Sequence, residues 1–247
     1  MSGTDAEGPP DGTVHVWRIP LSAPPHHVSG LAALLDPGER QRVARALPDD
    51  RARFRIAHGA TRAILGAYLG RPPQQLCYTH GRWGKPALAG HPELCFNLSH
   101  SGGLALLAVA VRRAVGIDVE RVSAADRSRK AERWFPPEEA AYVRAARDHD
   151  ESAARYALLW TRKEAWVKAA GGRMVHGLRL PVGPGLRDGA VVRDAEGRVP
   201  GWWSLTGVPA GEGYTAALAV SAGPGASPVR VKVRQWRTRR AAAAAGP

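Results

Sequence analysis

Near the middle of the 247-residue chain, the stretch GIDVER (116–121) follows an apolar run at 104–111. On an extended strand, side chains two positions apart point to the same face. This spacing predicts that Asp118 and Glu120 project together while the apolar residues between them pack behind. Two carboxylates on one face repel each other unless a cation lies between them, and Mg²⁺ prefers such oxygen ligands. The alternative is a solvated strand end, which is the commoner meaning of an isolated Asp-x-Glu pair.

Composition places the chain among soluble globular proteins, with 44% hydrophobic and 23% charged residues. Its length allows one large domain or two small ones. No apolar run approaches the ~20 residues that cross a bilayer, and residues 1–11 lack the features of a signal peptide. Cys77 and Cys95 provide neither a disulfide framework nor a zinc-binding spacing. We therefore expect a cytoplasmic protein with reduced thiols.

The net charge of +13 is the most pronounced feature of the composition. Such a field attracts nucleic acid, phosphorylated small molecules or an acidic protein partner. Most of the basic residues are arginines in a chain rich in Ala, Gly and Pro, a bias that indicates a GC-rich coding background. The arginine excess alone therefore says little about function.

The order of the periodic segments predicts an α+β fold with small, mostly antiparallel sheets and no fixed-period repeat. Strands are expected at 13–19, 76–79, 104–111, 115–120, 178–180, 190–192, 202–206, 214–220 and 229–236, and residues 94–103 are expected to form a strand that runs into a glycine-rich turn. Helices are expected at 28–47, with a break at 36–38, and at 51–69, 124–133, 135–147 and 152–170. Residues 1–12 and 237–247 are expected to be disordered.

The helix expected at 152–170 carries a second ionic group. Glu164 and Lys168 are four residues apart and share a face, and Trp160 lies one turn earlier on that face. A surface ion pair beside core tryptophans is the plainer interpretation. In a partly desolvated setting, however, Glu164 could complete a carboxylate set with Asp118 and Glu120.

Two further segments carry groups that suit phosphate. Residues 97–102, NLSHSG, offer hydroxyls, an imidazole and backbone N–H groups in an expected glycine-rich turn. The alternative is a polar hairpin turn with a structural histidine. The adjacent Ser99 and His100 cannot easily form a nucleophile–base pair, which argues against a serine hydrolase.

A lysine on a stiff turn forms the other segment, Gly84-Lys85-Pro86, with Arg82 just before it. Lys binds phosphate as a point charge and Arg as a fork, although a solvated loop explains the turn equally well. Arg62, on the helix expected at 51–69, either reaches a ligand or coats a helix face.

Three motifs together resemble the 4′-phosphopantetheinyl transferases of the surfactin-synthetase-activating (Sfp) type. They are Asn-x-Ser-His-Ser at 97–101, Gly-Ile-Asp-x-Glu at 116–120 and Trp-Thr-x-Lys-Glu-Ala-x-x-Lys at 160–168. Their order and separations agree with that family, Gly-Lys-Pro at 84–86 is a fourth match, and the likeness extends over roughly residues 14–220. Their joint occurrence is specific even though each motif alone is weak.

The resemblance implies two similar α/β halves, at 13–114 and 115–236, related by a pseudo-twofold axis in a monomer. Coenzyme A would bind in the cleft between them. The implied metal ligands, for Mg²⁺, are Asp118, Glu120 and Glu164. The implied contacts to coenzyme A are Arg62, Arg82, Lys85, Pro86, Ser99, His100, Lys163 and Lys168.

The implied reaction transfers 4′-phosphopantetheine from coenzyme A to a serine of an apo acyl or peptidyl carrier protein and releases 3′,5′-ADP. Lys168 would support the charge on the pyrophosphate, and Glu139 matches a glutamate proposed as the base. A one-residue shift would put Glu138 in that role. The family's basic cluster for the 3′-phosphate is only partly present, since Glu39 falls among Arg40, Arg42 and Arg45. Acidic carrier proteins would complement the basic surface.

Two other functions fit parts of the sequence. A basic nucleic-acid-binding protein would explain the charge, but the chain has no helix-turn-helix, zinc-finger or RNA-binding aromatic signature. A Mg²⁺-dependent nucleotide hydrolase would explain the carboxylates, but no Gly-x-x-x-x-Gly-Lys-Ser/Thr loop is present. We therefore expect neither nucleic acid nor a membrane among the partners.

Overall fold

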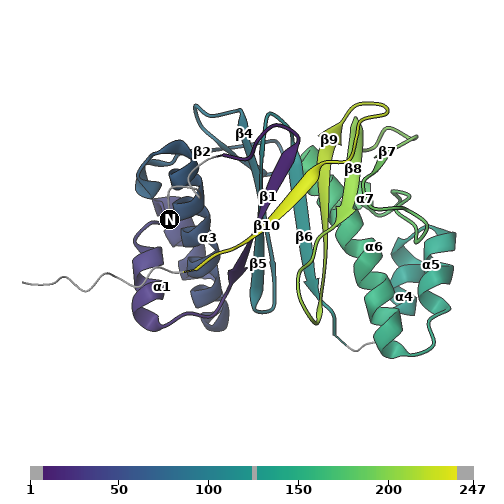
Figure 1. Cartoon of the computed structure of the whole chain (residues 1–247). Helices are drawn as coiled ribbons and strands as arrows, with labels where there is room; N and C mark the ends of the chain where they lie inside the picture. The colour runs from purple at the N-terminus through teal and green to yellow at the C-terminus, as the bar shows by residue number, and fades with distance from the viewer. Residues whose placement is uncertain (1–7, 124–126, 238–247) are drawn as a thin grey trace, which may run out of the picture.

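Two four-stranded sheets face each other at the centre of the molecule, and helices cover the outer side of each (Figure 1). The computed structural model describes residues 8–123 and 127–237. Its strands are β1 (Thr13–Pro20), β2 (Tyr78–His80), β3 (Pro86–Leu88), β4 (Leu94–Ser101), β5 (Leu104–Val111), β6 (Val115–Arg121), β7 (Ala190–Arg193), β8 (Trp202–Gly207), β9 (Tyr214–Ala222) and β10 (Arg230–Gln235). Its helices are α1 (Pro25–Ala32), α2 (Pro37–Arg45), α3 (Pro48–Leu69), the 3₁₀ turn η2 (Pro73–Gln75), α4 (Ser128–Trp134), α5 (Pro137–Arg144), α6 (His149–Ala170) and α7 (Met174–Gly177).

The first sheet has the order β10-β1-β5-β4 and the second the order β6-β9-β8-β7, while β2 and β3 form a separate hairpin. All strand pairs are antiparallel except β1 with β10, which is parallel. The last strand of the chain therefore returns to the sheet that contains the first.

Alternation along the strands separates the core into three layers. Most side chains of β5 and β6 are buried, because the sheet that contains each strand has the other sheet on one face and helices on the opposite face. One apolar cluster lies between the two sheets, with Leu106 and Ile117 at its centre. The others lie between each sheet and its covering helices, around Ile64 of α3 and Trp166 of α6.

The long helices of the two halves are built alike. α3 and α6 each contain 22 residues and end at a glycine in the left-handed conformation, Gly70 and Gly171. Each packs one face on its own sheet (Figure 1). The similarity supports the expected pair of related halves, although the division at residue 114 stays a prediction.

The predicted α+β class with small, mostly antiparallel sheets is confirmed. The predicted break at 36–38 is also present, because Asp36 and Glu39 form a capping box that starts α2. The predicted strand at 178–180 is wrong, since a turn follows α7 there. Residues 124–126 of one predicted helix, and 1–7 and 238–247 of the expected disordered ends, lie outside the described residues.

Within the described ranges, no helix combines the length and the apolar character needed to span a bilayer.

Candidate functional site

Alternate polar side chains of β4 join the first sheet to β6 of the second. The Ile117 N–H donates to Asn97 Oδ1 at 2.8 Å, and the Ser99 hydroxyl donates to Asp118 Oδ1 at 2.8 Å. Ser101 donates to Glu120 Oε2 at 3.0 Å. These serines lie within a regular strand rather than in the predicted turn, because β4 continues to Ser101 and only the two glycines after it form the turn.

Helix α6 brings a carboxylate and an ammonium group to the same place. Lys168 Nζ donates to Asp118 Oδ1 at 2.6 Å and to Ser99 Oγ at 3.1 Å, and it lies 3.9 Å from Glu164 Oε2. Five predicted site residues are thus brought together from three elements. We call them the site cluster: Ser99, Asp118, Glu120, Glu164 and Lys168.

Gly116 makes this approach of α6 to β6 possible. A Cβ at that position would lie 2.2 Å from the Ala165 carbonyl oxygen and 2.2 Å from the Ala169 nitrogen, both in the backbone of α6. Glycine is therefore required for close contact of strand and helix. That contact sets the distance between the carboxylates of β6 and those of α6.

Burial perturbs all three carboxyl groups, and neighbouring carboxylates add to the effect at Glu120 and Glu164. Burial raises the pKa of Asp118, and the ammonium of Lys168 partly opposes the rise. The pKa values of Glu120 and Glu164 are also raised, by burial first and then by the neighbouring carboxylates. A cation in their midst would relieve this repulsion.

The donor set fits a hard divalent ion in its chemistry. Asp118 Oδ2 is buried and has no hydrogen-bond partner, so one carboxylate oxygen is left for another ligand. As arranged here, no three His, Cys, Asp or Glu side chains in the described part of the chain form a ready metal-holding group. The ammonium of Lys168 is the cation that lies against Asp118 and Glu164.

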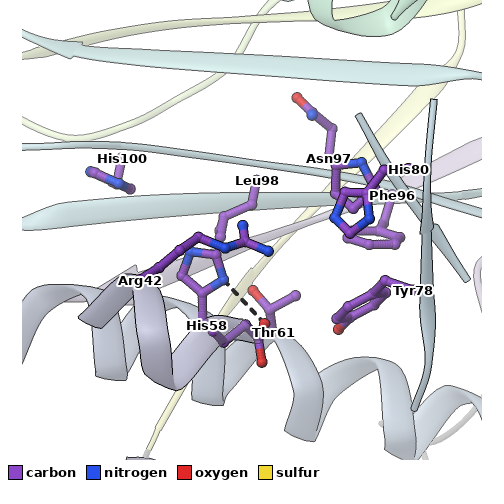
Figure 2. Close-up of a pocket in the computed structure, with 11 residues that line it drawn as sticks. Arg42, His58, Thr61, Tyr78, His80, Phe96, Asn97, Leu98 and His100 are labelled. Atoms are coloured by element: carbon purple, nitrogen blue, oxygen red, sulfur yellow. Dashed lines mark hydrogen bonds and ion pairs between the residues drawn. The ribbon is translucent and has the colours of Figure 1, made fainter. Parts of the chain in front are cut away.

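A pocket of about 210 Å³ lies on the other face of β4, toward α2 and α3. In Figure 2 the side chains of Arg42 and His58 point from the helices toward the strand that carries Leu98 and His100. Burial lowers the pKa of His100, and the charges of His58 and Lys168 add to this effect. The pocket lining contains the imidazoles of His58, His80 and His100, one guanidinium, that of Arg42, and one carboxylate, that of Glu39.

Arg62 does not reach this pocket. Its guanidinium is fully buried, donates to Asp36 and Glu39, and makes two more hydrogen bonds, both 3.0 Å long, to the carbonyls of Pro73 and Leu76. Glu39 also lies 3.3 Å from His58 Nδ1. Arg62 thus joins α3 to the start of α2 and to η2.

Glu139 and Lys163 form a separate buried pair on the far side of α6. Lys163 Nζ lies 2.7 Å from Glu139 Oε2 and also donates to the Leu180 carbonyl. The Val182 N–H donates to Glu139 Oε1 at 2.8 Å, while Oε2 accepts no hydrogen bond and lies in the ion pair with Lys163. Glu138, the neighbouring candidate, is exposed in the first turn of α5.

Replacing Glu139 with glutamine is expected to lower the free energy of unfolding by about 3 kcal/mol, because it leaves the Lys163 ammonium buried without a counter-ion. Chemical denaturation followed by circular dichroism measures this loss. As a control, Glu138→Gln should change stability by less than about 0.5 kcal/mol. Equal stability of the two variants would contradict the structural role of Glu139.

Lys85 is also placed away from the site cluster. Its ammonium donates to the carbonyls of Val115 at 2.9 Å and Ala169 at 2.7 Å, which ties the β2–β3 hairpin to β6 and α6. Arg82 lies exposed over the Trp83 ring at 4.7 Å. Pro86 begins β3 and lines the pocket beside His100.

Four residues of this region had no individual role in the sequence prediction, although Asn97 and Ser101 belong to the predicted NLSHSG segment and Arg42 to the early basic cluster. Asn97 and Ser101 share the face of Ser99 at two-residue spacing, so the strand alternation contained a usable signal. Arg42 and His58 line the pocket from two different helices. The sequence left open which early arginine contributes, because the meeting of Arg42 with His58 depends on how α2 and α3 pack.

The profile of the 4′-phosphopantetheinyl transferase superfamily matches residues 114–199. The chain is 40% identical to the 4′-phosphopantetheinyl transferase HetI of Nostoc sp. over 163 residues, which are 64% of this chain and 68% of that protein. It is 29% identical to a 4′-phosphopantetheinyl transferase of Bacillus subtilis, covering 60% of this chain and 69% of that one. It is 38% identical to the 4′-phosphopantetheinyl transferase AcpT of Salmonella typhimurium, covering 46% of this chain and 57% of that protein.

Proposed function

The chain belongs to the 4′-phosphopantetheinyl transferase superfamily, and from this premise we propose that it transfers 4′-phosphopantetheine from coenzyme A to a carrier-protein serine. The other product would be 3′,5′-ADP. The observation that carries the proposal is the convergence of Asp118, Glu164 and Lys168 beside Ser99. We further propose that it acts as a monomer of the Sfp type, since one chain supplies every residue of the site cluster.

We propose that Asp118, Glu120 and Glu164 hold a Mg²⁺ ion. When bound, such an ion stabilises negative charge on phosphoryl oxygens and orients them. The unpaired Oδ2 of Asp118 and the raised pKa values of the three carboxyl groups support this assignment. Lys168 would move from its contact with Asp118 to the pyrophosphate and stabilise charge on the departing nucleotide.

The pocket beside His100 is proposed to hold the nucleotide of coenzyme A. Arg42, His58 and His100 line it and would bind phosphate oxygens, with the Arg42 guanidinium as a fork and the imidazoles as donors. The partner that keeps His58 oriented is Glu39. Arg42 is thus our candidate among the early arginines for the 3′-phosphate.

The proton of the attacking serine is proposed to pass to Glu164. Glu164 has two carboxylate oxygens, so one could accept the proton while the other faces the ion. Glu139, the candidate from the sequence, is buried in an ion pair with Lys163 and accepts a hydrogen bond from the Val182 N–H. For Glu139 we therefore propose a positioning role, in which it holds α6 against the loop after α7.

The test is incubation of the protein with coenzyme A, Mg²⁺ and several apo carrier proteins, followed by intact-mass spectrometry. We expect at least one acidic carrier to gain the mass of phosphopantetheine on its serine. A carrier with that serine replaced by alanine is the control and should gain nothing. Release of 3′,5′-ADP without any carrier gaining mass would instead indicate a hydrolase.

A further inference from the structure

Side chains of β4 hold the junction between the two sheets at the site cluster. β4 and β6 are the end strands of their sheets, so two strands of different sheets meet there. Asn97 accepts a hydrogen bond from the Ile117 N–H, and Ser99 donates one to Asp118. Ser101, the last residue of β4, continues this series and lies beside the second carboxylate of β6.

The Ser101 hydroxyl makes two hydrogen bonds that fix its direction. Its oxygen accepts from the Arg121 N–H at 3.0 Å, and the hydroxyl donates to Glu120 Oε2 at 3.0 Å. A hydroxyl has one proton to donate, and an amide N–H can only donate, so that proton is left for the carboxylate. Ser101 therefore holds one oxygen of Glu120 in a set direction.

Glu120 is held differently from the other two carboxylates of the site cluster. Lys168 Nζ lies 2.6 Å from Asp118 Oδ1 and 3.9 Å from Glu164 Oε2. Within residues 8–123 and 127–237, no lysine or arginine forms an ion pair with Glu120. The hydrogen bond from Ser101 is therefore a larger part of what orients Glu120 than any one neutral contact is for Asp118.

The turn after Ser101 is packed tightly against the second sheet. The Gly103 N–H donates to the Tyr214 hydroxyl at 3.0 Å, and Tyr214 belongs to β9, which pairs with β6. Gly102 has a φ of +56°, and a Cβ there would lie 2.9 Å from Arg121 Cδ and 3.0 Å from Tyr214 Oη. Glycine is the residue that suits so close a turn. The backbone of Ser101 consequently has little freedom to move away from Glu120.

The two faces of β4 serve the two proposed subsites separately. Because successive side chains of a strand point to opposite faces, His100 lines the pocket with Arg42 and His58, whereas Ser99 and Ser101 contact β6. Loss of the Ser101 hydroxyl with the backbone of β4 in place should therefore affect the ion site and spare the nucleotide pocket.

We propose that Ser101 is a positioning residue for the divalent ion, because its hydroxyl aims Glu120 so that this carboxylate converges with Asp118 and Glu164. The inference rests on the proposed function, which supplies the ion. Ser101 acts through Glu120 and does not itself bind the ion. Hydrogen-bond partners of this kind typically contribute about 10–100-fold to the affinity of a metal site.

Mn²⁺ binding by the full chain in the presence of coenzyme A, followed by electron paramagnetic resonance, tests the proposal without measuring transfer. Ser101→Ala is expected to bind Mn²⁺ at least about tenfold more weakly than the unaltered chain. Ser101→Thr keeps the hydroxyl and should restore most of the affinity. Ser204→Ala is the matched control and should bind Mn²⁺ normally, because Ser204 is a buried serine of β8 whose hydroxyl donates to the Gly189 carbonyl at 3.4 Å.

Coenzyme A binding in the presence of EDTA distinguishes a positioning role from a general distortion of β4. Calorimetry is expected to give the same coenzyme A affinity for Ser101→Ala as for the unaltered chain, because His100 keeps its place on the other face. A parallel loss of coenzyme A affinity, or no recovery of Mn²⁺ binding in Ser101→Thr, would overturn the proposal.

The unaltered chain separates failure of this inference from failure of the proposed ion. Equal Mn²⁺ affinity in the unaltered chain and in Ser101→Ala would overturn the role of Ser101 alone. Absence of any Mn²⁺ site in the unaltered chain would overturn the proposed ion and the role of Ser101 together.

Discussion

The Asp118→Asn variant is expected to transfer phosphopantetheine about 10³-fold more slowly than the unaltered chain at saturating coenzyme A and Mg²⁺. The substitution keeps the shape of the side chain and its contact with Ser99. It removes the negative charge that faces Lys168 and Glu164. Initial rates with an apo carrier protein, followed by mass spectrometry, measure the effect.

The same variant should be no less stable than the parent chain. Burial raises the pKa of Asp118, so between the ordinary and the raised pKa the folded state binds more protons than the unfolded state. Its ionisation therefore lowers stability as the pH rises, and a neutral amide avoids this cost. A normal melting temperature with lost transfer would separate function from folding.

Asp194→Asn is the matched control. Asp194 is also a buried carboxylate that pairs with a cation, 3.1 Å from Arg198, but it lies outside the site cluster. We expect this variant to lose some stability and to keep its transfer rate. An equal loss of rate in both variants, or a normal rate in Asp118→Asn, would contradict the role given to Asp118.

Gly116→Val is expected to have the largest effect on the fold. Any Cβ at residue 116 would meet the backbone of α6 at 2.2 Å, and a backbone atom cannot turn away as a side chain can. The helix must then move from β6 or the segment must unfold, so we expect a loss of at least about 3 kcal/mol. Thermal and urea unfolding measure the loss, and transfer activity should fall with it because Glu164 moves away from Asp118.

Gly30→Ala provides the control for this substitution. Gly30 lies in α1, and nothing is found within 4 Å of a Cβ built there. Alanine is also the better helix former, so we expect equal or slightly higher stability. A Gly116→Val protein as stable as this control would show that α6 does not depend on the close contact.

Short-range pattern was enough to predict the elements that carry the site. The apolar run at 104–111 and the carboxylate pair at 118 and 120 mark strands, and the i, i+4 pair Glu164 and Lys168 marks a helix face. Lys163 lies five residues before Lys168, which places it about 140° away around a helix. The helical spacing alone therefore predicts that Lys163 lies apart from the site cluster.

Tertiary packing determined the rest. Arg62 and Lys85 are cations on predicted elements, and nothing local distinguishes a phosphate ligand from a structural tether. Arg62 meets Asp36 and Glu39 only because α2 folds back on α3, and Lys85 meets Val115 and Ala169 only because the hairpin crosses to the second half. The parallel return of β10 to β1 likewise pairs residues at opposite ends of the chain.

Electron paramagnetic resonance of Mn²⁺, titrated in the presence of coenzyme A, tests most directly whether the carboxylates of β6 and α6 form a divalent-ion site. The account predicts one site in the unaltered chain, with affinity at least about tenfold lower in Asp118→Asn and unchanged in Asp194→Asn. The same affinity in Asp118→Asn as in the unaltered chain would contradict it.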